Sequence, residues 1–150
     1  MIGKKIYQGQ FNLTTISFPI KCMCPKSIVQ VSPTIQCVNS WYLNYAAHCS
    51  DPVERFKVFM TCTVALIHEG QFFEKPLNPV LGETYQAKCA DGADLYVEQT
   101  SHHPPISHML IEGPNGAYRY SGYNECSVAF SVTNIKVNLL GHKKVKFHDG

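Results

Sequence analysis

Apolar and polar positions along the chain change their spacing once, near Pro76. Before it, apolar residues recur every three or four positions, which is typical of helices with one buried face. After it, they occur in short runs separated by glycine, asparagine and aspartate, which is typical of strands joined by tight turns. The sequence therefore predicts an α+β fold in one domain, with residues 34–70 helical and residues 71–150 an antiparallel β-meander.

Two helices are predicted in the first half of the chain. The first runs from Ser32-Pro33 to about residue 49, with Ser32 as N-cap, Pro33 at the first helical position and an apolar face of Ile35, Val38, Trp41 or Tyr42, and Tyr45. The second follows Asp51-Pro52-Val53-Glu54, which resembles a capping box, and ends at Gly70. Its apolar face consists of Val53, Phe56, Met60, Val64 and Ile67.

Six β-rich runs follow the helices. They are separated by Asp91-Gly92, by residues 113–116 (Gly-Pro-Asn-Gly) and by Gly141. Short consecutive strands with tight turns indicate a meander that curls around or against apolar groups. The runs are residues 84–89, 94–100, 106–112, 117–123, 127–139 and 144–148.

Composition and charge narrow the class of protein. A net charge of +2 is too small for a nucleic-acid binder, which usually concentrates Lys and Arg on one face. No apolar run is long enough to span a membrane, so membrane contact is expected to be peripheral. Seven cysteines without a C-x-x-C pair indicate reduced thiols rather than a disulfide framework or a zinc site. We therefore expect a cytoplasmic protein.

The most informative segment is Glu98-Gln99-Thr100-Ser101-His102-His103-Pro104-Pro105. The two prolines stiffen the backbone beside the two imidazoles, and rigidly held donors suit a fixed anion. A phosphate would favour protonated histidine, and each charge-assisted hydrogen bond would contribute roughly 1.5–3 kcal/mol. A metal site is disfavoured because neighbours in a strand point to opposite faces and no third ligand has a recognised spacing. The remaining alternative is a simple strand terminus.

A second stiff segment lies upstream, at residues 75–85 (Lys-Pro-Leu-Asn-Pro-Val-Leu-Gly-Glu-Thr-Tyr). Lys75 and Asn78 are three residues apart, so one turn of chain can aim both at a common ligand oxygen. The two segments together resemble the oxysterol-binding-protein-related family. The resemblance extends from about residue 15 to the end of the chain, including Gly122-Tyr123-Asn124 and Gly141-His142.

This resemblance implies a large, incomplete β-barrel around a lipid tunnel, preceded by a lid and helices. It implies lipid binding and non-vesicular lipid transfer, without enzymatic activity or a cofactor. The ligands would be phosphatidylinositol 4-phosphate and an exchanged sterol or phosphatidylserine. His102 and His103 would contact the 4-phosphate, and Lys75 and Asn78 the inositol phosphate. Asn124 would line the tunnel or, alternatively, be a β-turn asparagine, and residues 1–33 would form the lid.

The family's domain is much longer than 150 residues, so we expect this chain to be its N-terminal portion, with an unpaired strand edge near residues 144–148. As an isolated chain it would then be marginal or nonfunctional as a carrier. Two rival functions remain. One is a phosphoinositide sensor that moves no lipid, and the other is an enzyme in which the histidines act beside Glu83 or Glu98. No nucleophile or metal motif supports the enzyme.

Overall fold

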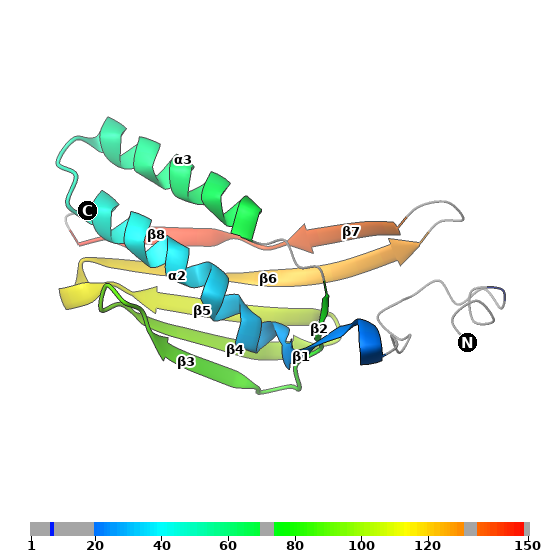
Figure 1. Cartoon of the computed structure of the whole chain (residues 1–150). Helices are drawn as coiled ribbons and strands as arrows, with labels where there is room; N and C mark the ends of the chain where they lie inside the picture. The colour runs from blue at the N-terminus through cyan, green and yellow to red at the C-terminus, as the bar shows by residue number, and fades with distance from the viewer. Residues whose placement is uncertain (1–6, 8–19, 70–73, 131–134, 149–150) are drawn as a thin grey trace.

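The computed structural model describes residues 7, 20–69, 74–130 and 135–148, and it confirms the predicted order of helices followed by strands (Figure 1). A 3-10 turn, η2 (Ile20–Cys22), leads into strand β1 (Met23–Ser27) and helices α2 (Ile28–Ala47) and α3 (Pro52–Glu69). After them come β2 (Lys75–Leu77), β3 (Thr84–Lys88), β4 (Asp94–His102), β5 (Pro105–Glu112), the 3-10 turn η3 (Pro114–Gly116), β6 (Tyr118–Phe130), β7 (Ile135–Leu140) and β8 (Lys143–Phe147).

Strands β3 to β7 form an antiparallel sheet in chain order, and β8 pairs with the first half of β6 while β7 pairs with its second half. The sheet is open, and α2 lies across one of its faces with α3 alongside (Figure 1). No described strand pairs with the outer edge of β8. A separate two-stranded sheet joins β1 and β2 in parallel. This small sheet was not predicted.

Strand β6 differs from the prediction of two strands at 117–123 and 127–139. It is continuous from Tyr118 to Phe130, because the residues around Gly122 and Asn124 pair with β5 instead of turning. Asn124 lies opposite Ser107 in this ladder. The β-turn alternative for Asn124 was therefore wrong.

Helix α2 begins earlier than predicted. Ser27 is its N-cap, since the Ser27 hydroxyl accepts the Gln30 N–H at 3.2 Å and the Gln30 side-chain oxygen accepts the Ser27 N–H at 2.9 Å. This reciprocal capping box satisfies two backbone donors that Ser32 could not reach. Ser32 is consequently not the cap, and Pro33 is buried inside the helix. Of the predicted lid, residues 1–6 and 8–19 lie outside the described residues, and 23–33 form β1 and the start of α2.

The core lies between α2 and the face of the sheet that it covers, called the covered face below. Side chains alternate along each strand, so every second residue points to this face. Val29 and Leu43 of α2 are fully buried there, and the Tyr118 hydroxyl donates to the Ser40 carbonyl at 3.3 Å. The buried apolar residues of the sheet are Leu95, Val97, Met109, Ile111, Tyr118 and Tyr120.

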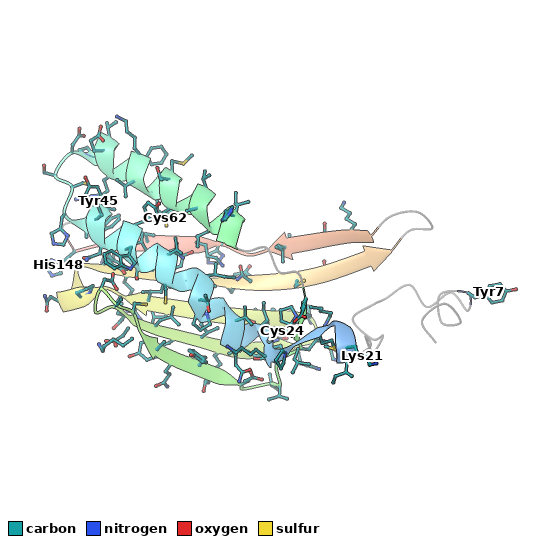
Figure 2. All side chains as sticks on the ribbon, viewed as in Figure 1. Tyr7, Lys21, Cys24, Tyr45, Cys62 and His148 are labelled. Carbon is teal, nitrogen blue, oxygen red and sulfur yellow. The ribbon has the colours of Figure 1, made fainter. Side chains whose placement is uncertain are left out.

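Helix α3 has the predicted length, but its apolar face is exposed. Phe56 and Ile67 on this face are 62% and 70% accessible. The helix instead turns Cys62 toward α2, where the thiol donates to the Asn39 side-chain oxygen at 2.8 Å (Figure 2). No helix in the described part of the chain is long and apolar enough to cross a membrane. Helix α3 therefore packs with the side that carries Cys62 and Phe59, and Arg55 adds a hydrogen bond to the Ala46 carbonyl at 3.2 Å.

Candidate functional site

The two predicted histidines lie at the tip of the β4–β5 hairpin. His102 ends β4 opposite Pro105, while His103 and Pro104 form the turn and are joined by a cis peptide bond. Because His103 has left the strand, its ring comes to the same side as that of His102, with ring centroids 4.6 Å apart and an edge-on arrangement. Both side chains are exposed. The alternation of a regular strand, which argued against a metal site, does not apply to His103, and the two imidazoles can meet one ligand.

Two adjacent imidazoles could also bind a metal ion, but a metal site needs further ligands. Free thiols are found at Cys24, Cys37, Cys49, Cys62, Cys89 and Cys126. No group of three or more His, Cys, Asp or Glu side chains in residues 20–69, 74–130 and 135–148 could hold a metal ion.

Lys75 begins β2 and Asn78 directly follows this strand, so their side chains lie close together. The Lys75 ammonium donates to the Asn78 side-chain oxygen at 3.0 Å. Burial raises the pKa of the Cys126 thiol on β6, and the nearby Lys75 charge works against this rise. Lys75 therefore lies close to the second half of β6. A ligand oxygen within reach of the ammonium is also within reach of the Asn78 amide.

The loop after Asn78 is tied to the sheet by Glu83. One carboxylate oxygen accepts the Ser27 hydroxyl at the N-cap of α2, and the other accepts the Val80 N–H at 3.1 Å. The backbone adds two bonds, from the Gly82 N–H to the Gln99 carbonyl at 2.8 Å and from the Gln99 N–H to the Glu83 carbonyl at 2.9 Å. These contacts hold the Lys75–Asn78 segment in place relative to β4.

The same contacts bear on the rival enzyme hypothesis. Both oxygens of Glu83 are engaged in structural hydrogen bonds. Glu98 pairs with His108 in the β4–β5 ladder and, by alternation, points away from the covered face. Neither carboxylate is therefore placed to act as a base beside the two histidines.

A row of polar residues crosses the covered face next to the hairpin tip. Gln99, Ser107 and Asn124 are neighbours on β4, β5 and β6, and Gln99 is only 1% accessible. The Ser107 hydroxyl donates to the Gln99 side-chain oxygen, and the Gln99 amide donates to the Ser101 carbonyl at 2.6 Å. Sequence reasoning singled out only Asn124. The break in the apolar alternation at Gln99 and Ser107 was the signal for the rest.

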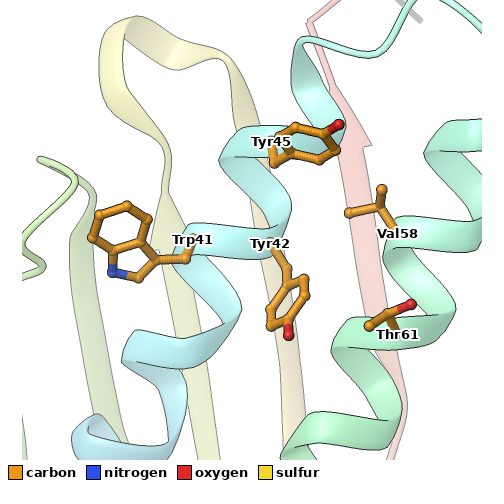
Figure 3. Close-up of a pocket in the computed structure, with 5 residues that line it drawn as sticks. All are labelled: Trp41, Tyr42, Tyr45, Val58 and Thr61. Atoms are coloured by element: carbon orange, nitrogen blue, oxygen red, sulfur yellow. The ribbon is translucent and has the colours of Figure 1, made fainter.

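An apolar hollow lies elsewhere, between the two helices. A shallow pocket of about 280 Å³ opens between α2 and α3 (Figure 3). None of the predicted headgroup residues borders it. It is lined by Trp41, Tyr42, Tyr45, Val58 and Thr61.

Fold and site together define a class of protein. An open antiparallel sheet, covered on one face by a helix, presents imidazoles, an ammonium and amides at one end, which suits binding of an anion. The family model described as oxysterol-binding protein matches residues 5–150. The chain belongs to the oxysterol-binding protein family.

Several known proteins are similar to the chain. Oxysterol-binding protein 9 of Dictyostelium discoideum is 34% identical over 149 residues, covering 99% of this chain and 35% of the relative. Human oxysterol-binding protein-related protein 1 is 37% identical over 112 residues, covering 73% of this chain and 12% of the relative. The chain thus spans about a third or less of these relatives.

Solved structures share the fold. The Osh1 ORD domain in complex with ergosterol superposes with a TM-score of 0.80 and 25% identity, covering 91% of this chain and 32% of that one. The Osh3 ORD of Saccharomyces cerevisiae, in complex with PI(4)P, gives a TM-score of 0.80 at 22% identity, covering 99% of this chain and 40% of that one. The two helices and open sheet therefore match a part of the ORD fold.

Proposed function

We propose that this chain binds the headgroup of phosphatidylinositol 4-phosphate with His102, His103, Lys75 and Asn78. The observation that carries the proposal is the close approach of the His102 and His103 rings, whose centroids are 4.6 Å apart. The Lys75–Asn78 hydrogen bond of 3.0 Å adds a second pair of donors. A phosphate presents several oxygens, and such donors satisfy them with charge-assisted hydrogen bonds. The hairpin and the Glu83 contacts hold these donors before the ligand arrives.

We propose further that the chain is the N-terminal portion of one lipid-binding domain, with the start of the chain as its lid. Burying an acyl chain of ~16 methylenes is worth more than about 10 kcal/mol at roughly 0.8 kcal/mol each, so a carrier has to enclose its cargo. The chain aligns with about a third of the Osh1 domain, which is solved with ergosterol and with cholesterol. The walls of a closed tunnel would come mainly from the remaining two thirds.

The activity proposed for the whole domain is non-vesicular lipid transfer by peripheral contact with cytoplasmic membrane surfaces. Phosphoinositide and a second lipid, a sterol or phosphatidylserine, would compete for one tunnel, so each would displace the other at a membrane rich in the competitor. No covalent step is involved. The lid and the second lipid are implied by the family rather than by the described contacts.

The headgroup site is tested by a double substitution, His102→Ala with His103→Ala. Binding to phosphatidylcholine vesicles that contain phosphatidylinositol 4-phosphate should fall about 100-fold, since two charge-assisted hydrogen bonds are lost. The matched control replaces His108 and His142, whose rings both contact Tyr123 on the opposite face of the sheet. Equal loss in both double variants would contradict the proposed site.

Transfer is tested separately from binding. A donor–acceptor vesicle assay measures movement of labelled phosphoinositide, and mass spectrometry of the recovered lipid measures chemical change. Movement of unchanged lipid supports transfer by this chain. Binding without movement would indicate a sensor, or a portion that needs the rest of its domain, and altered lipid would indicate an enzyme.

A further inference from the structure

The covered face changes from apolar to polar within β6 and β8. Opposite residues in the ladder are Tyr120 and Val145 in one row, and Gly122 and Lys143 in the next. Lys143 lies on the covered face because it alternates with Val145 and Phe147, which pack against the core. The next position on β6 that points to this face is Asn124. A charged residue therefore occupies the covered face immediately beside the apolar core.

Gly122 leaves space for this lysine, and Gly141 allows the turn before β8 to approach β6. A Cβ atom on Gly122 would lie 2.7 Å from Cδ of Lys143 and 2.3 Å from the His142 carbonyl oxygen, so the lysine stem lies directly across Gly122. Gly141 has a φ of +136° and a Cβ there would lie 2.1 Å from the Tyr123 carbonyl oxygen. The close approach of these backbones requires glycine at both positions. The placement of Lys143 is thus fixed by the backbone of two strands.

The Lys143 ammonium is held at one spot by two acceptors. It donates to the Asn124 side-chain oxygen at 2.6 Å and to the Tyr123 carbonyl at 2.8 Å. An ammonium has three donors, so one N–H is left over. Among the described residues, no carboxylate forms an ion pair with it. Desolvation lowers the pKa of the Lys143 amine to about 8, although the side chain as a whole keeps access to solvent.

Asn124 presents donors as well. Because its side-chain oxygen accepts from Lys143, its amide group is left with two N–H donors. The pair therefore offers only N–H groups and a positive charge to a ligand. A neutral hydroxyl would leave this charge uncompensated, whereas an anionic oxygen would neutralise it. The chemistry of the pair favours an anion over a sterol hydroxyl.

We propose that Lys143 and Asn124 form a second anion-binding subsite, which binds a phosphate or carboxylate oxygen of a lipid. The subsite shares the covered face with the headgroup residues: Ser107, the β5 neighbour of Asn124, is two residues from Pro105, the neighbour of His102. Two residues of strand span roughly 7 Å. The charge of Lys75 acts on Cys126, which is two residues after Asn124 on β6. This inference rests on the proposed lipid-binding function and extends it.

The anionic oxygen has two possible sources. One is the phosphodiester of the same phosphoinositide, which lies on the glycerol side of the ring. The other is the headgroup of a separate anionic phospholipid, such as phosphatidylserine. Phosphatidylinositol separates the two, because it carries the phosphodiester without the 4-phosphate.

The test uses the whole chain with Lys143→Met, which keeps the alkyl stem over Gly122 and removes the ammonium. The matched control is Lys144→Met, on the next residue of β8, which points to the opposite face and lies opposite Ser121. Binding is measured to phosphatidylcholine vesicles containing phosphatidylinositol 4-phosphate, phosphatidylinositol, phosphatidylserine or cholesterol. Thermal melting of both variants confirms that they are folded.

The expected result is a loss of about tenfold in binding of at least one anionic lipid by Lys143→Met, the size of one charge-assisted hydrogen bond. Lys144→Met should change the binding of each lipid less than about twofold. Lys143→Met should likewise change cholesterol binding less than about twofold. Loss for both inositol lipids assigns the phosphodiester, and loss for phosphatidylserine alone assigns a separate phospholipid. Equal effects of the two variants, equal loss of cholesterol binding, or no binding of any anionic lipid by the unaltered chain overturns the subsite.

Failure of the second subsite can be distinguished from failure of the headgroup site. If His102→Ala with His103→Ala leaves phosphatidylinositol 4-phosphate binding intact, the proposed headgroup residues are wrong. The phosphatidylinositol and phosphatidylserine measurements on Lys143→Met still decide the second subsite in that case, because neither lipid has a 4-phosphate.

Discussion

The covered face of the sheet has two halves that are built on the same strands and held by different forces. In one half, rows such as Leu95, Ile111 and Tyr120 are almost completely buried beneath α2. In the other half, the row of Gln99, Ser107 and Asn124 is followed by the exposed hairpin tip. The first half is stabilised by burial of apolar surface, and the second by directed hydrogen bonds.

The change between the halves requires no change in backbone. The β5–β6 ladder keeps its register through it, and the register of β4 shifts only after Gln99. The main difference is that the side chains at alternate positions become polar. Stability and ligand binding can consequently be separated along one strand. The substitutions below test this separation through the free energy of unfolding, beginning with the largest expected loss.

Leu95→Ala should destabilise the apolar half most. Leu95 is fully buried, and removing such a side chain leaves a cavity that costs about 2–5 kcal/mol. Urea unfolding provides the measurement. The control, Leu110→Ala, removes the same atoms from a half-buried site on the opposite face and should cost clearly less. Similar losses in the two variants would mean that the covered face is not the core.

Alkaline pH should weaken the contact between α2 and α3. Burial raises the pKa of Cys62 from 9.0 to about 11. Between these values the unfolded chain has already lost the thiol proton and the folded chain has kept it, so stability falls as pH rises from 9 to 11. The loss from this group is about 2 kcal/mol.

The pH dependence is measured as the unfolding free energy of the unaltered chain and of Cys62→Ala at several pH values. The variant should be less stable at pH 8 and should lose about 2 kcal/mol less between pH 9 and 11. Parallel curves would show that the thiol does not titrate with unfolding.

Gln99→Leu tests the polar row. Although leucine is apolar and Gln99 is buried, the substitution should destabilise the fold by about 1–2 kcal/mol, because Ser107 and the Ser101 carbonyl lose their partners. Adding Ser107→Ala should restore part of the loss, since one unsatisfied hydroxyl is then removed. A stabilising effect of Gln99→Leu alone would show that the row contributes nothing as a hydrogen-bonded unit.

The hairpin tip should show the smallest effect on stability. His102→Ala with His103→Ala removes two exposed side chains, so the unfolding free energy should change by less than about 0.5 kcal/mol. The same variant is the one expected to lose phosphoinositide binding. A large loss of stability would mean that these histidines support the fold, and the separation of the two halves would not hold.

Local patterns predicted most of the elements. The turn residues bounded most of the strands correctly, and Pro52 with Glu54 marked the start of α3. The start of α2 was missed because a proline signal at Pro33 outweighed the Ser27–Gln30 capping box, which becomes visible only when both ends of the box are compared. The continuity of β6 through Gly122 was missed because a glycine with an asparagine two residues later also signals a turn.

The sequence by itself determined the order of helices and strands, the family and the four residues proposed for the headgroup, because these depend on short-range spacing and on two contiguous motifs. Tertiary structure decided which of these residues lie close to one another. Only pairing across strands brings Lys143 to Asn124, 19 positions earlier in the chain, and only the hairpin turn brings the two imidazoles to one side. Contacts between residues distant in sequence follow from register, which is set by the whole sheet rather than by any one segment.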